Sequence, residues 1–319
     1  MMMLTVNKAK PFLKWAGGKN QLLGQFENYY PSALRKGQIE RYIEPFIGGG
    51  AVFFEMMQKY HLRYSYISDM NKDLILTYQV IQQKPGILLE FLEQYQKVYD
   101  NSIEEQRTPL FLSIRKQFNS PPSEINYKKF SDNWIPRAAQ LIFLNKTCFN
   151  GLFRLNSKGQ FNVPFGKYKH PNILDGHNIL LVSKILQNTE ILIADYKNCF
   201  SRADDRTFIY FDPPYRPINK TASFTNYTGF IFTEREQIEL SAFFKALDTE
   251  KHSKLMLSNS DPKNENPNDD FFEKTYHGYN LHRVHANRMI NCHADKRGRI
   301  NELVITNYEH EPQTMSLNA

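Results

Sequence analysis

Residues 41–69 read RYIEPFIGGGAVFFEMMQKYHLRYSYISD, and this stretch decides the fold that we expect for the chain. Residues 41–47 are typical of a short strand, the three glycines at 48–50 of a tight turn, and residues 51–60 of an apolar helix. A second strand at 64–69 ends in the carboxylate of Asp69. Strand, glycine turn, helix, strand and acidic residue form one half of a nucleotide-binding α/β sheet. The stretch therefore predicts an open, mostly parallel sheet covered by helices.

The rest of the chain extends this α/β pattern and interrupts it once. From about residue 85 to 150 the pattern is helical and rich in aromatic residues, and residues 156–166 indicate a tight hairpin. Further elements are expected at 71–81 (a helix capped by Asn71), 191–195, 207–212, 234–247, 254–258 and 281–308. We therefore expect an α/β domain in residues 1–80 and 189–310, an inserted, mostly helical domain in 81–188, and a disordered polar tail in 311–319.

The composition narrows the class of protein and its partners. With 319 residues, of which 41% are hydrophobic, the chain can bury a sizeable core. A net charge of +7 favours polyanionic partners, because each Lys or Arg placed on a phosphate releases a counterion. No apolar run approaches the roughly 20 residues of a membrane span, and the N-terminus lacks the pattern of a secretory signal. The cysteines Cys148, Cys199 and Cys292 are far apart and odd in number, which favours reduced thiols in a cytoplasm over disulfides or a zinc site.

The strongest chemical signal is Asp212-Pro213-Pro214-Tyr215, directly after the apolar residues 208–211. Consecutive prolines cannot continue a strand, so the chain must leave the sheet at the carboxyl edge, where ligands bind. An amino group on a heteroaromatic ring is a poor nucleophile, because its lone pair is delocalised. The Asp212 carboxylate and the Pro213 carbonyl can accept both of its N–H bonds and offset the positive charge that develops during attack on a methyl donor. The alternative is an acidic turn capped by prolines.

Two further motifs indicate a cofactor site. The glycines at 48–50 let the backbone approach a ligand closely, and Asp69 is placed to bind ribose hydroxyls. The alternatives are a simple strand-to-helix loop and a helix cap. The chain lacks the Gly-x-Gly-x-x-Gly motif of dinucleotide sites and the Gly-x-x-x-x-Gly-Lys-[Ser/Thr] phosphate loop. The opening motif Pro11 to Lys19 ends in Gly-Gly-Lys, which indicates a loop that brings a cation to an anionic ligand or to the edge of a base.

Together these motifs resemble the Dam-type DNA adenine N6-methyltransferases, which act on the sequence GATC. The resemblance extends from residue 11 to about residue 308, in the order that the family uses. Its segments are Pro11 to Lys19, Glu44 to Gly50, Asp69, Phe149 to Arg154, Phe161 to Gly166, Asp212 to Tyr215 and the closing hairpin. The resemblance implies a Rossmann-like methyltransferase sheet that binds S-adenosylmethionine, an inserted domain that reads the target, double-stranded DNA as substrate, and a reaction that needs no metal.

The resemblance also implies roles for individual residues. The expected catalytic residues are Asp212, Pro213, Pro214 and Tyr215, with Tyr215 stacked on a base that has left the duplex. The expected cofactor-binding residues are Trp15, Lys19, Pro45, Phe46, Gly48, Gly50, Asp69, Asp195 and Asp212. The expected DNA-binding residues are Lys19, Phe149, Asn150, Leu152, Arg154, Pro164, Lys167, Arg288, Arg297 and Arg299. Of these, Phe149 is expected to wedge into the duplex and Arg154 to read a guanine through its O6 and N7 atoms.

Two departures from the family pattern concern DNA recognition. Phe149 stands where a Tyr is expected, and Lys167 stands where an Arg often contacts a phosphate, so the target sequence is less firmly implied than the reaction. One alternative is an amino-methylating enzyme that acts on N4 of cytosine or on adenine in RNA. Another is a DNA-binding module without catalysis, which would have a broken Asp-Pro-Pro-Tyr or glycine motif. The sequence leaves open whether a restriction endonuclease accompanies the enzyme, and a monomer is the default expectation.

Overall fold

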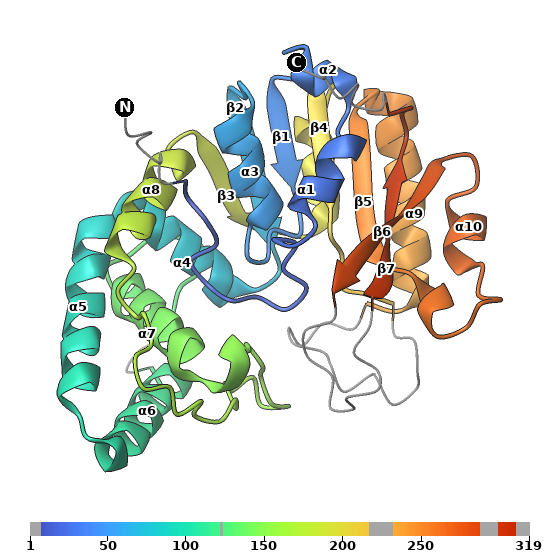
Figure 1. The fold of residues 1–319 in the computed structure, drawn as a ribbon. Coiled ribbons are helices and arrows are strands. Elements are labelled where there is room, and N and C mark those ends of the chain that lie inside the picture. Colours follow the sequence, from blue (N-terminus) through green and yellow to red (C-terminus); the bar gives the residue numbers. More distant parts are fainter. Residues whose placement is uncertain (1–7, 122–123, 217–231, 288–298, 311–319) are drawn as a thin grey trace, which may run out of the picture.

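A single mixed sheet organises the computed structural model, which describes residues 8–121, 124–216, 232–287 and 299–310 (Figure 1). The seven strands of this sheet lie in the order β3-β2-β1-β4-β5-β7-β6. Their bounds are β1 (Arg41–Glu44), β2 (Tyr64–Asp69), β3 (Thr189–Ile193), β4 (Thr207–Phe211), β5 (Lys254–Ser260), β6 (Asn280–Asn287) and β7 (Arg299–Thr306). Strands β1 to β5 are parallel, whereas β7 pairs antiparallel with β5 and with β6. The predicted α/β sheet and its late hairpin are confirmed.

The strand order places a topological switch point between β1 and β4. From β1 the chain continues to β2 and β3 on one side, and it returns to β4 and β5 on the other. In sheets of this kind, ligands bind outside the carboxyl ends of the strands at the point where the order reverses. The glycine turn after β1 and the Asp-Pro-Pro-Tyr motif after β4 therefore adjoin the place where a ligand is expected.

Side chains cap the N-termini of helices α4 (Lys72–Gln83) and α9 (Glu234–Lys251). Asn71 accepts a hydrogen bond from the Leu74 N–H group (3.0 Å), as predicted, and Thr233 and Glu236 form a capping box. The helices are α1 (Leu23–Phe26), α2 (Ser32–Arg35), α3 (Ala51–Lys59), α4 (Lys72–Gln83), α5 (Pro85–Asn101), α6 (Glu104–Asn119), α7 (Trp134–Thr147), α8 (Gly176–Leu186), α9 (Glu234–Lys251) and α10 (Phe271–Thr275). Short 3₁₀ helices are η1 (Glu27–Tyr29), η2 (Phe149–Gly151), η3 (Tyr196–Arg202) and η5 (Pro262–Asn264). No described helix has the length and hydropathy of a membrane span.

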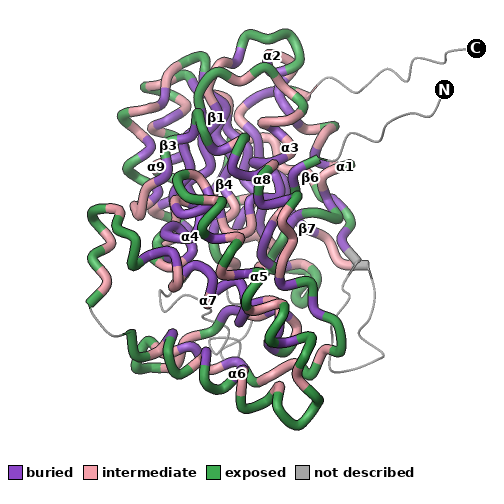
Figure 2. Tube along the Cα trace, turned by 90° about the vertical axis from the view of Figure 1, so that its left-hand side faces the viewer, coloured by how far each residue is buried: buried purple, intermediate pink, exposed green. Residues whose placement is uncertain are grey.

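Two apolar cores lie on opposite faces of the sheet, because side chains alternate along each strand. On β4, Phe208 and Tyr210 belong to the core that α1, α3 and α4 cover. Ile209 and Phe211 belong to the second core, which α9, α10 and η3 cover. Figure 2 shows buried residues concentrated along the strands and exposed residues on the outer side of α6. The result is a three-layer α/β/α arrangement, in which the first core continues into helices α5 to α7.

Helices α5 to α7 fall between β2 and β3 in the chain and lie to one side of the sheet (Figure 1). Helix α8, which the sequence did not reveal, packs against α3 and α4 as well as α5. The tight hairpin expected at residues 156–166 is present as a turn closed by one antiparallel bridge, Leu155 to Phe161, and it does not extend into a longer ladder. The Asn156 side chain stabilises this turn, because it accepts hydrogen bonds from the Lys158 and Gln160 N–H groups.

A nearly buried ion pair joins the sheet-covering helix α4 to helix α7. The Arg137 guanidinium donates two hydrogen bonds to the Asp73 carboxylate (2.5 and 2.9 Å), and Tyr127 donates a third (2.8 Å). The guanidinium also lies over the Phe118 ring, 4.2 Å from its centroid. Because both side chains are largely removed from water, the loss of either one would leave the other charge buried without its partner.

We predict that Arg137→Met lowers the free energy of unfolding by about 3 kcal/mol, because the Asp73 carboxylate would stay buried without its cation. Urea denaturation measures the loss. Arg202→Met is the matched control: Arg202 pairs with Glu190 through two hydrogen bonds and lies over Tyr66, but the pair is far more exposed. Its loss should cost about 1 kcal/mol or less. Equal losses in the two variants would contradict this account.

Candidate active site

Acidic side chains meet at the carboxyl edge of the sheet. Glu44 ends β1, Asp69 ends β2, Asp195 follows β3 by two residues, and Asp212 follows β4 directly. Because these strands are parallel, their carboxyl ends lie at the same edge. The structure thus brings the predicted residues Asp69, Asp195 and Asp212 to one edge of the sheet, with Asp212 at the switch point.

The Asp212 carboxylate is held from both sides. Its Oδ2 atom accepts a hydrogen bond from the Lys19 ammonium (2.7 Å), and its Oδ1 atom accepts one from the Ser258 hydroxyl on β5 (3.1 Å). Ser258 in turn lies 2.6 Å from the Tyr210 hydroxyl. Burial raises the pKa of Asp212 above its ordinary value, although the neighbouring Lys19 charge acts to lower it. The carboxylate is fixed in orientation and keeps 20% of its side-chain surface exposed.

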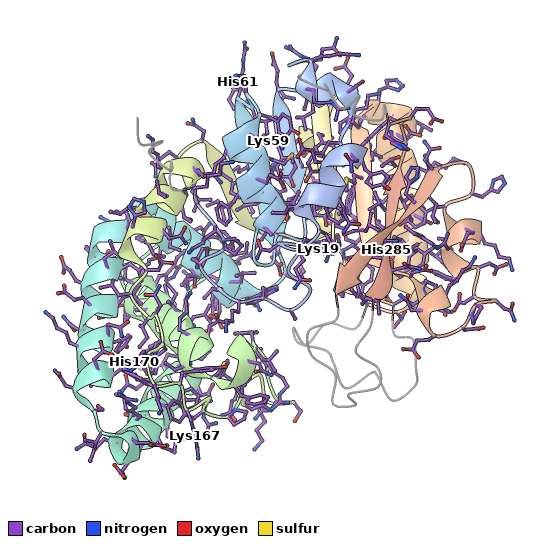
Figure 3. All side chains as sticks on the ribbon, viewed as in Figure 1. Lys19, Lys59, His61, Lys167, His170 and His285 are labelled. Atoms are coloured by element: carbon purple, nitrogen blue, oxygen red, sulfur yellow. The ribbon has the colours of Figure 1, made fainter. Side chains whose placement is uncertain are left out.

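Lys19 is the cation of the site. Its side chain is buried, and its Nζ atom donates to the Gly17 carbonyl (2.6 Å) as well as to Asp212. The Glu302 carboxylate on β7 lies 4.0 Å away. Burial alone would lower the pKa of Lys19, but the charges of Asp212 and Glu302 raise it by more, so the ammonium stays protonated. Figure 3 shows Lys19 at the edge of the sheet, well away from Lys167 on the helical part.

Tyr215 is anchored by a residue that the sequence analysis missed. Its hydroxyl donates to Glu302 (2.9 Å), and the Lys19 ammonium lies 5.0 Å from its ring centroid. Burial raises the pKa of Glu302, and the Lys19 charge opposes this rise. Ser258 reaches Asp212 through the parallel pairing of β5 with β4, and Glu302 reaches the site through the antiparallel pairing of β7 with β5. The sequence carries no signal that singles out either residue, because each has a polar neighbour, Asn259 or Asn301.

Glu44 adds a third carboxyl group to this cluster. It is buried and accepts a hydrogen bond from the Tyr42 hydroxyl (2.5 Å). Burial holds the pKa of Glu44 well above its ordinary value, and the charge of Asp212 raises it further. Asp212 and Glu302 thus lie beside one ammonium, and an additional positive charge at the open side of the cluster would favour the ionised form of the carboxyl groups.

The glycine turn after β1 depends on Asp69 and Trp15. Asp69 accepts hydrogen bonds from the Gly48 N–H group (3.2 Å) and the Asn71 N–H group (2.9 Å), whereas Asn71 is the cap of α4. Gly48 has a positive φ of 46°, and a Cβ atom there would lie 2.9 Å from the Trp15 ring. Glycine is therefore required at this position.

The other expected cofactor residues lie around this turn. Pro45 is buried, and Phe46 stacks on Tyr196 with ring centroids 5.6 Å apart. Asp195 accepts a hydrogen bond from the Lys197 N–H group (2.9 Å) and so caps η3. Gly50 is the left-handed residue that precedes α3.

Two loop segments of the helical part lie side by side and present the expected DNA-contacting residues. The Phe149 N–H group donates to the Pro164 carbonyl (2.8 Å), and the Asn162 N–H group donates to the Arg154 carbonyl (3.1 Å). Arg154 is exposed and oriented by the Asn162 side chain (2.8 Å). Phe149, at 51% exposed, is an unusually open aromatic residue. The expected DNA-binding residues that lie on these two loop segments are Phe149, Asn150, Leu152, Arg154, Pro164 and Lys167.

Other expected DNA contacts are not tested by the geometry. Arg288 and Arg297 lie outside the described residues, as do Cys292 and the tail 311–319, and only the backbone of Arg299 is described, at the start of β7. Cys148 and Cys199 are free and buried. Within the described ranges, no group of three His, Cys, Asp or Glu residues is arranged to hold a metal ion.

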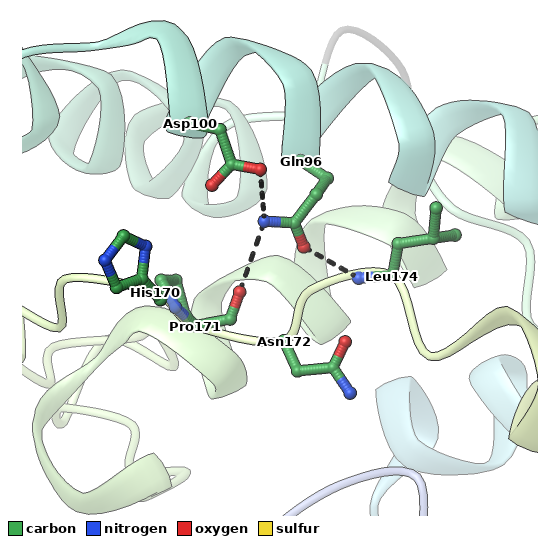
Figure 4. Close-up of a pocket in the computed structure, with 6 residues that line it drawn as sticks. All are labelled: Gln96, Asp100, His170, Pro171, Asn172 and Leu174. Atoms are coloured by element: carbon green, nitrogen blue, oxygen red, sulfur yellow. Dashed lines mark hydrogen bonds between the residues drawn. The ribbon is translucent and has the colours of Figure 1, made fainter.

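Two pockets of the described structure lie away from this cluster of carboxyl groups. One, of about 500 Å³, lies between α5 and residues 170–174 (Figure 4). The Gln96 side chain bonds there to Asp100 and to the backbone of Pro171 and Leu174, so its amide is already engaged within the chain. Another, of about 350 Å³, lies at the opposite edge of the sheet, where Arg41 and Tyr64 begin their strands.

Comparison with known proteins agrees with this geometry. The model of the D12 class of N6 adenine-specific DNA methyltransferases matches residues 15–290. The type II methyltransferase M.MjaIII of Methanocaldococcus jannaschii is 47% identical, with 94% of this chain and 100% of that protein aligned. M1.LlaDCHI of Lactococcus lactis, another type II methyltransferase, is 37% identical over 97% and 99%, and the DNA adenine methylase of Escherichia coli is 30% identical over 94% and 95%. The chain belongs to the D12 class of N6 adenine-specific DNA methyltransferases.

Proposed function

We propose that this DNA adenine methyltransferase uses S-adenosylmethionine and modifies the adenine of GATC. The observation that carries the proposal is the Asp212 carboxylate, fixed by Lys19 and Ser258 at the switch point of the sheet. The family match supports adenine as the base. The resemblance of the sequence to the Dam-type enzymes supports GATC as the target.

The residues present fit the proposed cofactor. Asp69 lies at the strand end where ribose hydroxyls are bound in such sheets. The glycines at 48–50 form a tight turn directly after β1, with Trp15 packed against Gly48. The excess of carboxyl groups over ammonium groups around Lys19 suits a cationic ligand. When bound, the cofactor supplies a methyl group that its positively charged sulfur makes electrophilic. We assign Trp15, Lys19, Pro45, Phe46, Gly48, Gly50, Asp69, Asp195 and Asp212 to its surroundings.

Two acceptors on one turn suit an exocyclic amino group. In the described part of the chain, no donor reaches the Pro213 carbonyl, whereas the Pro214 carbonyl accepts a hydrogen bond from Gln237 (3.0 Å). Asp212 and Pro213 can therefore accept the two N–H bonds of adenine N6. The carboxyl groups nearby stabilise the positive charge that grows on this nitrogen. The Tyr215 ring, anchored through Glu302, supplies a stacking surface for the flipped base.

The two loop segments that carry Phe149 to Arg154 and Pro164 to Lys167 have side chains that can contact duplex DNA. The exposed Phe149 can fill the space that a flipped base leaves, as apolar wedges do in other DNA-bending proteins. Arg154 has the bidentate geometry that reads guanine, and Lys167 is an exposed cation for phosphate. We propose that Asn150, Leu152, Pro164 and the arginines Arg288, Arg297 and Arg299 complete the contact. Two relatives bear the names of type II methyltransferases, which favours a role beside a restriction endonuclease, and we propose a monomer as the acting species.

The target can be tested directly on unmethylated plasmid. The purified enzyme with S-adenosylmethionine should place N6-methyladenine in GATC and leave the other adenines unmodified. Sequencing that detects N6-methyladenine maps the product, and mass spectrometry of the nucleosides identifies the base. Methylation in another sequence would overturn the GATC assignment, and N4-methylcytosine would overturn the assignment of the base.

We predict that Asp212→Asn lowers the single-turnover rate of methylation by about a hundredfold or more, because a neutral amide stabilises developing positive charge poorly. Affinity for duplex DNA should be largely retained, since phosphate contacts dominate it. Asp205→Asn is the control, because Asp205 is exposed and lies before β4, at the far end of the same strand. A rate close to that of the unaltered enzyme would refute the role of Asp212.

The pH dependence of the rate should report the Lys19 charge. Asp212 must be ionised to act, and its pKa is raised by burial, so activity should fall on the acidic side at a higher pH than an ordinary aspartate implies. Lys19→Gln removes the charge that lowers this pKa and should move the acidic limb to still higher pH. The charges of Glu44 and Glu302 interact with that of Asp212, so the acidic limb of the pH–rate profile reports the three carboxyl groups together. The exposed Lys245→Gln is the control, and an unmoved limb in Lys19→Gln would contradict the prediction.

A further inference from the structure

Three side-chain amides hold the segment that leads into the active site. Each amide accepts a hydrogen bond from the backbone N–H group of one residue and donates one to the carbonyl of the same residue. The pairs are Gln58 on α3 with Ala9 (2.7 and 2.9 Å), Asn178 on α8 with Lys10 (3.0 and 3.0 Å) and Asn145 on α7 with Lys14 (2.9 and 2.9 Å). Each amide therefore forms the pair of hydrogen bonds that a backbone residue of a neighbouring strand would form, although residues 9–14 belong to no strand.

Asn145 differs from the other two in what it also contacts. Its Nδ2 atom donates a further hydrogen bond to the Gly151 carbonyl (2.8 Å) in the turn of Phe149 to Gly151. Asn145 is 1% exposed, and its bond to the Gly151 carbonyl is buried, so losing it would leave that carbonyl without this partner. One buried amide thus connects the loop that carries Trp15 to the turn that carries Phe149.

Side-chain packing follows the same route. Gly151 has a positive φ of 65°, and a Cβ atom there would lie 2.5 Å from the Lys14 side chain, so the two residues are in close contact. Trp15 stacks on Phe153 with ring centroids 5.4 Å apart and also packs against Gly48. A continuous set of contacts therefore leads from the glycine turn, through Trp15 and Lys14, to the turn of Phe149 to Gly151.

We propose that Asn145 is a positioning residue for target recognition, which sets the turn of Phe149 to Gly151, and with it Arg154, relative to the active-site loop. This inference rests on the proposed function, because it assigns DNA reading to that turn. Other bonds hold the turn only within the helical part: Phe149 bonds to Pro164, and the Asn150 N–H group donates to the Tyr168 hydroxyl (3.1 Å). Without Asn145 the turn would keep its shape but lose its register against the catalytic centre.

The comparison of Asn145→Ala with Asn178→Ala tests this role, because both remove an amide clamp from the same segment. The measured quantity is the ratio of kcat/KM for a duplex with one GATC to that for duplexes with a single base pair changed in the site. Asn145→Ala should lower this ratio by about tenfold, the effect of losing one buried hydrogen bond at a carbonyl. Asn178→Ala should leave it within about twofold, since its side chain does not reach the turn. Thermal unfolding of both variants separates recognition from stability.

An unchanged ratio in Asn145→Ala, or an equal fall in Asn178→Ala, would overturn the proposal. If Asn145→Ala does not fold, Asn145→Asp decides by the same ratio, because it keeps the acceptor for the Lys14 N–H group and loses both donated bonds. Failure of the unaltered enzyme to prefer GATC would instead refute the proposed target. The same variants would then be compared on the sequence mapped in plasmid DNA, so the two failures are distinguishable.

Discussion

The ion pair between Lys19 and Asp212 is the contact on which the arrangement of the active site depends. It joins the N-terminal loop to the end of β4, which are 193 residues apart in the chain. Without this ammonium, the carboxyl groups of Asp212, Glu302 and Glu44 would face one another at the switch point with no opposite charge among them. The cost of burying the charges is offset because Ser258 and Gly17 supply the remaining hydrogen bonds. The Lys19 ammonium therefore stabilises carboxyl groups that lie close together at a buried edge of the sheet.

Much of the fold follows from local sequence patterns. Residues 41–69 gave the first strand, turn, helix and second strand correctly, because the periodicity of apolar residues and the glycines specify them locally. The Asp-Pro-Pro-Tyr motif could be placed at the carboxyl edge because prolines end a strand. Helix α8 was missed although its buried residues Ile179, Val182 and Leu186 recur at the three- and four-residue spacing of a helix. The expected hairpin at residues 156–166 is limited to one antiparallel bridge, and the Asn156 side chain stabilises its turn.

The electrostatic partners of Asp212 could not be predicted in the same way. Ser258 reaches the site through the pairing of β5 with β4, and Glu302 through the pairing of the antiparallel β7 with β5. Neither pairing nor its register can be read directly from the sequence. Lys19 was expected from the family resemblance, but its burial and its bond to Asp212 are properties of the folded chain. The same holds for Asn145, whose three hydrogen bonds link segments that are far apart in sequence. Local patterns thus locate the catalytic motif, and tertiary contacts supply the groups that position it.

The central claim is that Asp212 and Pro213 accept the amino group of a flipped adenine. A crystal structure of the enzyme with a GATC duplex and a non-reactive analogue of S-adenosylmethionine tests it most directly. The account predicts that the adenine N6 atom lies within hydrogen-bonding distance of the Asp212 carboxylate and the Pro213 carbonyl, with its ring against Tyr215. An adenine that remains stacked in the duplex, or that enters the site with N6 directed away from Asp212, would contradict it.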